Sequence, residues 1–213
     1  MQRVEVRDRL HQLDVSRETL QRLDIFAKLV EKWNPKINLV SKTDVESLWD
    51  RHIVDSIQIA GLSHVPGAWV DLGSGGGFPS IVVAVVRNIK SPQHMVCVES
   101  DERKCAFLRT AARELGLVVD VQNTRIEDMH VAQPFETVSA RALAPLPKLL
   151  EYSLPVLERS GCAIFPKGKK WKEEVRAAER SWSFDLDVIN SLTDAEAAIL
   201  RLTNIRKKSE ASL

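Results

Sequence analysis

Apolar residues recur at helical spacing along the first sixty residues, which predicts two helices before the first strand. We expect the first helix to begin after Ser16, whose hydroxyl can cap its N-terminus. It should end at Asn34-Pro35, because the residue before a proline disfavours helical geometry. Its apolar stripe consists of Leu20, Leu23, Ala27 and Val30.

A second helix is predicted from a capping-box pattern, TDVE, at residues 43–46. Its stripe consists of Val45, Leu48, Trp49, His52, Ile53, Ser56, Ile57 and Ala60. On this pattern His52 is a buried core residue rather than a catalyst, and Trp33 and Trp49 are packing anchors. We treat residues 1–64 as an N-terminal helical extension and residues 65–213 as the main domain.

Short apolar runs then alternate with amphipathic segments, which is typical of a doubly wound, mostly parallel α/β sheet. The predicted strands are 68–72, 94–100, 118–123, 137–140 and 162–168, and the predicted helices are 78–88, 101–116, 145–157 and 171–182. Two further runs, 183–193 and 197–206, are too close for a crossover helix. They should form an antiparallel pair at one edge of the sheet.

Composition narrows the class of protein without identifying it. The chain has 213 residues, 44% of them hydrophobic, and a formal net charge of +1, so any nucleic-acid surface must be a local basic patch. No run is long and apolar enough to span a membrane, and the first ten residues do not resemble a signal peptide. Three cysteines without a CxxC pair and five dispersed histidines predict a cytoplasmic protein with reduced thiols and no metal. Without an obvious exposed apolar stripe, we expect a monomer.

The segment DLGSGGGFP, residues 71–79, follows the first predicted strand and places four glycines in five positions. A phosphate-binding P-loop would need Gly-Lys-Ser/Thr, and a nicotinamide-binding loop would need glycine where Phe78 stands. The remaining match is acid-x-G-x-G-x-G, with Gly73, Gly75 and Gly77, which is typical of S-adenosylmethionine (SAM) methyltransferases. A tight turn alone would explain one or two of these glycines.

Glu99 stands at the end of the second predicted strand, where an acid can accept hydrogen bonds from both ribose hydroxyls of a nucleoside cofactor. The alternative is a carboxylate that only stabilises the N-terminus of the next helix. The coincidence of glycine loop and acid favours the ribose role.

An ordered set of segments resembles the bacterial family that makes 7-methylguanosine in 16S ribosomal RNA, also called glucose-inhibited division protein B. The segments are WNPKINLVS (33–41), RHIVDS (51–56), DLGSGGGFP (71–79), the ES-DERK-FL stretch (99–108), TRIED (124–128), SARA (139–142) and FPKGK (165–169). The resemblance implies a class I methyltransferase fold that uses SAM and acts on 16S ribosomal RNA of the small subunit. It also implies that Phe78 and Arg141 lie at the cofactor and that Ile126 and Glu127 flank the adenine. The glycine loop and the acid at Glu99 differ modestly from common members, and no required group is lost.

The acceptor atom implied by the resemblance agrees with the motifs that the chain lacks. The segment after the fourth strand reads SARALAPLP, without the Pro-Pro-aromatic motif of exocyclic-amine methylation or the cysteine of carbon-5 methylation. Guanine N7 carries a free lone pair and needs no general base, so alignment in a dry site can suffice. Arg141 is the candidate catalytic residue, because its planar fork can hold guanine O6 or a phosphate. The alternative for Arg141 is a clamp without a role in the transition state.

Arg125 and Lys167 are the predicted RNA contacts. Other basic residues lie near them, namely Arg103, Lys104, Arg109, Lys169, Lys170, Lys172 and Arg176, while Phe165 and Trp171 could stack on bases. The alternative is a solvated helix face, which Glu173, Glu174 and Glu179 favour. Two other functions stay open: a methyltransferase for a small molecule or protein, and a ribosome-assembly factor that keeps SAM as a structural ligand.

Overall fold

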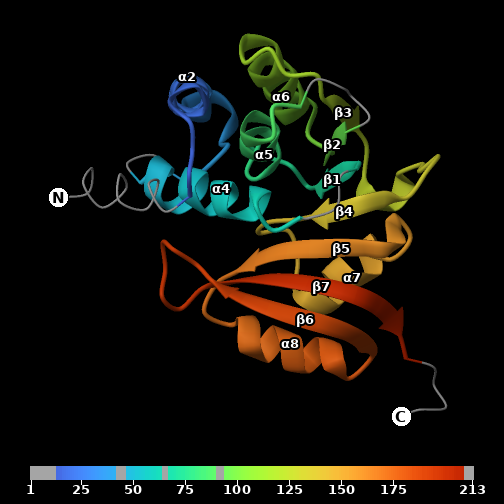
Figure 1. Cartoon of the computed structure of the whole chain (residues 1–213). Coiled ribbons are helices and arrows are strands. Elements are labelled where there is room, and N and C mark those ends of the chain that lie inside the picture. Colours follow the sequence, from blue (N-terminus) through green and yellow to red (C-terminus); the bar gives the residue numbers. More distant parts are fainter. Residues whose placement is uncertain (1–12, 42–46, 64–66, 90–93, 209–213) are drawn as a thin grey trace.

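A single sheet runs through the protein in the computed structural model, which describes residues 13–41, 47–63, 67–89 and 94–208. Within these residues, seven strands pair in the order β3-β2-β1-β4-β5-β7-β6. Figure 1 shows the sheet with α2, α5 and α6 near the β3 end and α8 near the β6 end. The strands are β1 Trp69–Leu72, β2 Met95–Glu99, β3 Asp120–Asn123, β4 Phe135–Ser139, β5 Leu157–Lys167, β6 Trp182–Asn190 and β7 Ala198–Lys207.

The first five strands are parallel, and the last two run antiparallel, as the sequence predicted. β7 also pairs antiparallel with β5, so the last strand in the chain lies inside the sheet and β6 forms the edge. Strand order reverses between β1 and β4. In sheets of this kind, ligands bind beyond the carboxyl ends of the strands at that point.

Side chains alternate between two buried layers along each central strand. Trp69 packs with the layer formed by the helices before and between the first three strands, whereas Val70 packs with the layer of the later helices. The first layer includes α4 Val54–Ala60, α5 Ser80–Val86 and α6 Glu102–Glu114, and the second includes α7 Leu146–Ser153 and α8 Trp171–Glu179. The doubly wound α/β prediction is therefore confirmed.

Helix α2, Arg17–Ile37, begins as predicted but ends later. The Thr19 amide donates to Ser16 Oγ at 3.1 Å, which confirms the N-cap. The predicted end at Asn34-Pro35 is wrong, because the helix continues to Ile37, whose side chain is buried in the core. The helix ends at the C-cap Asn38, whose amide donates to the Asn34 carbonyl, and Asn34 Oδ1 accepts the amide of Val40 at 2.9 Å just beyond it.

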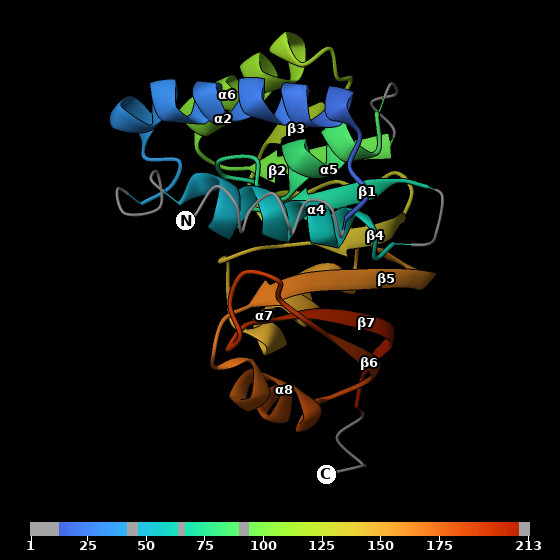
Figure 2. The ribbon, with the colours of Figure 1, turned by 60° about the vertical axis from the view of Figure 1, so that its left-hand side comes forward.

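α2 lies across α5 and α6, as Figure 2 shows. The rings of Trp33 and Phe107 are 5.8 Å apart between α2 and α6, and Phe26 lies 6.3 Å from Phe107. Trp49 also packs against this core, so both predicted anchors are confirmed. Because Leu23 shares a buried cluster with Trp69 of the sheet, part of the helical extension belongs to the same core. The boundary at residue 64 stays a prediction.

The second predicted helix has a different geometry at its start. Trp49–Ile53 forms a π-helical turn before α4, and the predicted capping box lies outside the described residues. A π turn adds one residue per turn and is often found at functional sites.

Strand β5 also differs from prediction, since it begins at Leu157 rather than residue 162. Residues 158–160 are exposed and carry no apolar alternation, so their sequence gave no strand signal.

Candidate functional site

The glycine loop after β1 is fixed to the end of β2. The amides of Gly73 and Ser74 both donate to the Val98 carbonyl, at 2.9 and 3.0 Å. Between this loop and the carboxyl ends of β2, β3 and β4 lies a pocket of about 550 Å³. It is lined by Leu39, Val40, His52, Gly73, Ser74, Gly75, Gly76, Phe78, Val98, Glu99, Ser100, Lys104, Thr124, Arg125, Ile126, Glu127, Arg141, Ala142, Leu143 and Tyr152. We call it the cofactor pocket.

The glycines of the loop divide into two groups. Gly73 and Gly75 line the pocket, and both have left-handed φ angles, of 69° and 52°. Gly77 is absent from the pocket lining, although the sequence predicted it to contact the cofactor. A Cβ at Gly77 would lie 2.7 Å from Ile81 Cγ1 and 3.1 Å from Phe26 Cζ. The structure therefore assigns Gly77 to the packing of the loop on α5 and α2.

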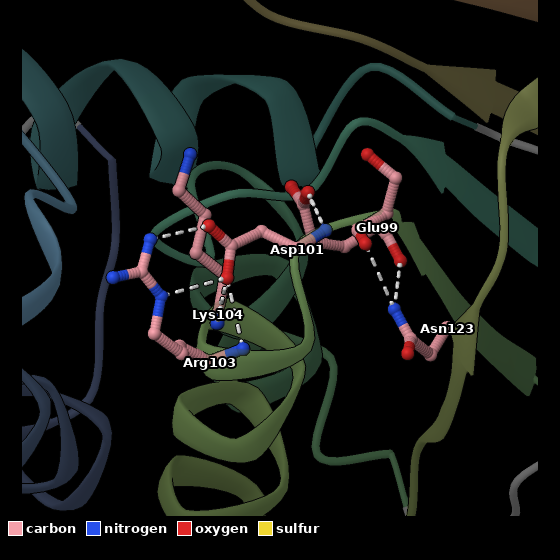
Figure 3. Close-up of polar contacts among 6 residues, drawn as sticks. Glu99, Asp101, Arg103, Lys104 and Asn123 are labelled. Carbon is pink, nitrogen blue, oxygen red and sulfur yellow. Dashed lines mark hydrogen bonds and ion pairs between the residues drawn. The ribbon is translucent and has the colours of Figure 1, made fainter.

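The Glu99 carboxylate is held in place by two backbone amides. The Gly75 amide donates to Oε2 at 2.9 Å. The Asp101 amide donates to Oε1 at 2.8 Å, and Figure 3 shows Glu99 beside Asp101. A carboxylate has about four acceptor positions, so capacity remains for two hydroxyls. The N-cap of α6 is Asp101, which accepts the Arg103 amide at 2.8 Å. Because Asp101 caps the helix, Glu99 is not required for that role.

Asp71 lies under the loop and is fully buried. Its Oδ1 accepts the hydroxyl of Ser139 at 2.6 Å, and Trp69 Nε1 donates to the same Ser139 oxygen at 2.8 Å. Burial raises the pKa of Asp71 to about 6, although the Ser139 hydrogen bond opposes this shift. The motif acid thus joins β1 to β4 beneath the site rather than facing the pocket.

The predicted adenine residues lie in a short 3-10 helix, Ile126–Asp128, after β3. Ile126 and Glu127 both line the cofactor pocket. The Tyr152 hydroxyl donates to Glu127 Oε1 at 2.7 Å, and this hydrogen bond lowers the pKa of Glu127. Tyr152, which comes from α7, was not predicted from the sequence as a site residue. Arg125, predicted to contact RNA, is exposed at the rim of the same pocket.

Arg141 follows β4 and contacts Nδ1 of His52 through its guanidinium group. The His52 ring also stacks at 5.2 Å from Phe78. His52 is buried, as predicted, but it lines the cofactor pocket beside Arg141 as well as packing in the core. The only signal in the sequence was the RHIVDS segment, which carried the resemblance without assigning a role to this histidine.

Another pocket, of about 910 Å³, adjoins the cofactor pocket. We call it the second pocket. Arg141, Ala142 and Leu143 line both pockets and form the wall between them. Asp55 of α4 lies in the second pocket, where Thr193 Oγ1 and Ser191 Oγ donate to its Oδ1 at 2.6 and 3.0 Å. Burial raises the pKa of Asp55, while the Thr193 hydrogen bond and the charge of Arg141 oppose the shift.

The predicted basic surface is only partly exposed. Lys167 Nζ pairs with Glu174 at 2.7 Å and donates to the Ala144 carbonyl at 2.7 Å, with 9% of its side chain exposed. An RNA contact by Lys167 stays a prediction and would require this ion pair to open. Phe165 is fully buried, so its predicted stacking on bases is wrong. The other basic residues predicted for this surface, Lys169, Lys170, Lys172 and Arg176, are exposed.

Clusters of metal ligands and membrane-spanning helices are both absent from the part of the chain that the structure describes. They hold no group of three or more His, Cys, Asp or Glu that could bind a metal ion. No described helix is long and apolar enough to cross a membrane. The three cysteines are buried free thiols.

The residues of the cofactor pocket fit SAM. Glycines leave the backbone open along one wall, a held carboxylate at Glu99 suits two ribose hydroxyls, and Ile126 offers an apolar side chain beside a base. Together with the strand order, this site defines a class I SAM-dependent methyltransferase fold. Solved structures agree: a ribosomal protein L11 methylase from Lactobacillus delbrueckii subsp. bulgaricus has a TM-score of 0.57, with 17% identity over 75% of this chain and 79% of that one.

The chain belongs to the GidB family, described as rRNA small subunit methyltransferase G, whose model matches residues 19–202. A relative from Ruegeria sp. (strain TM1040), named ribosomal RNA small subunit methyltransferase G, is 49% identical over 92% of this chain and 96% of its own. One of the same name from Paracoccus denitrificans (strain Pd 1222) is 46% identical over 91% of this chain and 99% of its own. The resemblance found in the sequence is therefore confirmed.

Proposed function

We propose that this protein transfers a methyl group from SAM to N7 of a guanosine in 16S ribosomal RNA of the small subunit. The observation that carries the proposal is the cofactor pocket, in which the glycine loop and the fixed Glu99 carboxylate meet Arg141 at one end. Family membership supports the RNA substrate. Since ribosomal subunits are cytoplasmic, we also propose that the protein acts there, as a monomer, with residues 65–213 as its catalytic domain.

When bound, SAM supplies an electrophilic methyl group on a sulfonium sulfur. The N7 lone pair forms the new C–N bond as the S–CH3 bond breaks, which leaves a neutral thioether and a positively charged methylated base. Because N7 carries no proton, the site needs no general base. The residues of this chain have to align the base and exclude water.

Each predicted cofactor residue receives a role in this proposal. Glu99 binds the ribose hydroxyls, while Gly73, Gly75 and Phe78 line the methionine side of the pocket. Ile126 and Glu127 flank the adenine, with Glu127 held by Tyr152. For Gly77 we propose a packing role instead of cofactor contact, because a Cβ at this position would collide with the side chains of Ile81 and Phe26.

Arg141 is the proposed catalytic residue, because it lies on the wall between the two pockets. Its contact with His52 fixes the guanidinium at this wall. From there the planar fork can hold guanine O6, which lies beside N7 on the same edge of the base. Arg125, exposed at the rim, is positioned to contact a phosphate, and Lys167 is a second candidate.

The test is a labelling experiment with purified protein, methyl-labelled SAM and small ribosomal subunits that lack the modification. The RNA is digested and the labelled nucleoside is identified by mass spectrometry, with Arg141→Ala as the control variant. Label in 7-methylguanosine supports the proposal. Label in another nucleoside contradicts the acceptor atom, and absence of label with SAM binding intact favours a small-molecule enzyme or a binding module.

A further inference from the structure

The second pocket has the surroundings that a nucleobase requires. Leu143, Pro145 and Pro166 give it apolar walls on which a flat ring can lie, and Asp55 supplies a carboxylate. Its wall of Arg141, Ala142 and Leu143 is shared with the cofactor pocket, so a base held here faces the reaction site across Arg141. Nothing in the proposed cofactor contacts uses Asp55.

The Asp55 carboxylate is positioned by two elements. It belongs to α4, one turn after His52, and both hydroxyls that bind it, from Ser191 and Thr193, come from the connection between β6 and β7. Both donate to Oδ1, and this pair of bonds fixes the plane of the carboxylate. Oδ1 and Oδ2 together offer about four acceptor positions, of which the hydroxyls use two.

Methylation at N7 does not by itself select guanine, because adenine has the same nitrogen on its major-groove edge. A base can be identified by its Watson–Crick edge, where guanine carries two adjacent donors, N1–H and the exocyclic amine. A carboxylate can accept from such a pair, and at Asp55 the two acceptor positions that the hydroxyls leave unused are those of Oδ2. With N1–H and the amine at Asp55, N7 lies on the major-groove edge and O6 at the corner between the two edges, and both can face Arg141.

We propose that the second pocket binds the acceptor guanine and that Asp55 is its specificity-determining residue, accepting N1–H and the exocyclic amine. This inference rests on the proposed function. Ser191 and Thr193 act as positioning residues, because they hold the carboxylate without contacting the base. Arg141 then serves both pockets, with His52 on the cofactor side and O6 of the base on the other.

The test uses the full chain saturated with S-adenosylhomocysteine, and the probes are guanosine, inosine and adenosine 5′-monophosphate. Inosine lacks only the exocyclic amine, so the difference between the first two nucleotides reports the contact with Asp55. Binding is followed by NMR titration. We expect the wild type to bind the guanosine nucleotide about tenfold or more tightly than the inosine nucleotide, as a lost hydrogen bond to a charged group implies.

Asp55→Asn should abolish this preference, because an amide oxygen accepts on one side only and its NH2 group faces a donor. Thr193→Ala should reduce the preference while leaving the carboxylate in place. The matched control is Asp187→Asn on β6, which removes a carboxylate that is 67% exposed and paired with Arg201; it should behave as wild type. Thermal unfolding and SAM binding of each variant show that the fold and the cofactor pocket are intact.

The inference is overturned by a wild type without preference for the guanosine nucleotide, or by a preference that survives Asp55→Asn. If Asp55→Asn fails to fold, the Thr193→Ala variant decides, and an unchanged preference there counts against the inference. The labelling experiment above distinguishes failure of this inference from failure of the proposed function. If the wild type forms 7-methylguanosine but shows no preference among the nucleotides, the proposed function stands and the role of Asp55 does not.

Discussion

The Arg141 guanidinium contacts Nδ1 of His52, which joins the end of β4 to the π-helical turn before α4. A guanidinium only donates hydrogen bonds, so Nδ1 is the accepting nitrogen of this contact. The contact links the N-terminal helices to the sheet at the point where the two pockets meet.

If this contact positions Arg141 for catalysis, the effects of the two residues should depend on one another. We expect Arg141→Ala to lower kcat/KM for methyl transfer about 100-fold, a typical loss for one transition-state donor. His52→Ala should lower it less, and the double variant should resemble Arg141→Ala, with a coupling energy of at least ~0.5 kcal/mol. Single-turnover rates for the four proteins complete the cycle, and additive effects would show that the contact has no part in catalysis.

Glu99 should contribute to SAM affinity through its fixed carboxylate. Glu99→Gln removes the charge that two ribose hydroxyls would meet, so we expect the dissociation constant for SAM to rise about tenfold or more. Isothermal titration calorimetry measures this directly. Glu102→Gln changes an exposed carboxylate in the first turn of α6 and should leave the affinity unchanged. Equal effects of both variants would point to the helix N-terminus instead of a ribose contact.

Gly77 should matter for stability. An alanine there takes a φ angle of 81° and brings its Cβ within 2.7 Å of Ile81, so we expect a loss of ~2–4 kcal/mol in the free energy of unfolding. Gly116→Ala is the matched control, because Gly116 has a φ of 60° but no atom within 4 Å of a built Cβ. It should cost only the ~1–2 kcal/mol of the backbone conformation. Urea unfolding of both variants isolates the packing contribution.

Asp71 predicts a pH dependence of stability. Its pKa rises from 3.8 to about 6 on folding, so its ionisation destabilises the folded state. The contribution of Asp71 is fully present below about pH 4 and is lost as pH rises through about 6. We therefore expect the stability difference between wild type and Asp71→Asn to change by ~3 kcal/mol between pH 4 and 7, at about 1.4 kcal/mol per pKa unit. A difference independent of pH would exclude this titration.

Arg125 should contribute to RNA affinity through charge alone. Arg125→Ala should weaken binding to small ribosomal subunits and reduce the slope of log affinity against log salt by about 0.7–0.9, the release of one counterion. SAM affinity should stay unchanged. Arg113→Ala is the control, since Arg113 is equally charged, 72% exposed and at the far end of α6. A salt slope that falls equally in both variants would indicate a general charge effect.

The sequence predicted those parts of the site that depend on local pattern. The glycine loop, the acid at Glu99 and the alternation of strands and helices follow from residue spacing, because each is formed by neighbours in the chain. The contact of His52 with Arg141 joins residues 89 positions apart, and its helical stripe showed only that His52 is buried. Tyr152, Asp55 and the Lys167–Glu174 ion pair were missed for the same reason. The cofactor contact of Gly77 stays a prediction, because a motif cannot tell a glycine facing a ligand from one facing a neighbouring side chain.

The position of β7 between β5 and β6 has a consequence for synthesis of the protein. Until β7 emerges from the ribosome, the inner edge of β5 has no partner, and unpaired strand edges invite pairing with other chains. The Ser191 and Thr193 hydroxyls of the second pocket lie on the connection between β6 and β7, and pairing of these two strands fixes its ends. A nascent chain can therefore form the glycine loop and the Glu99 acid before β7 is made, whereas the proposed guanine site is complete only once β7 has been translated and paired.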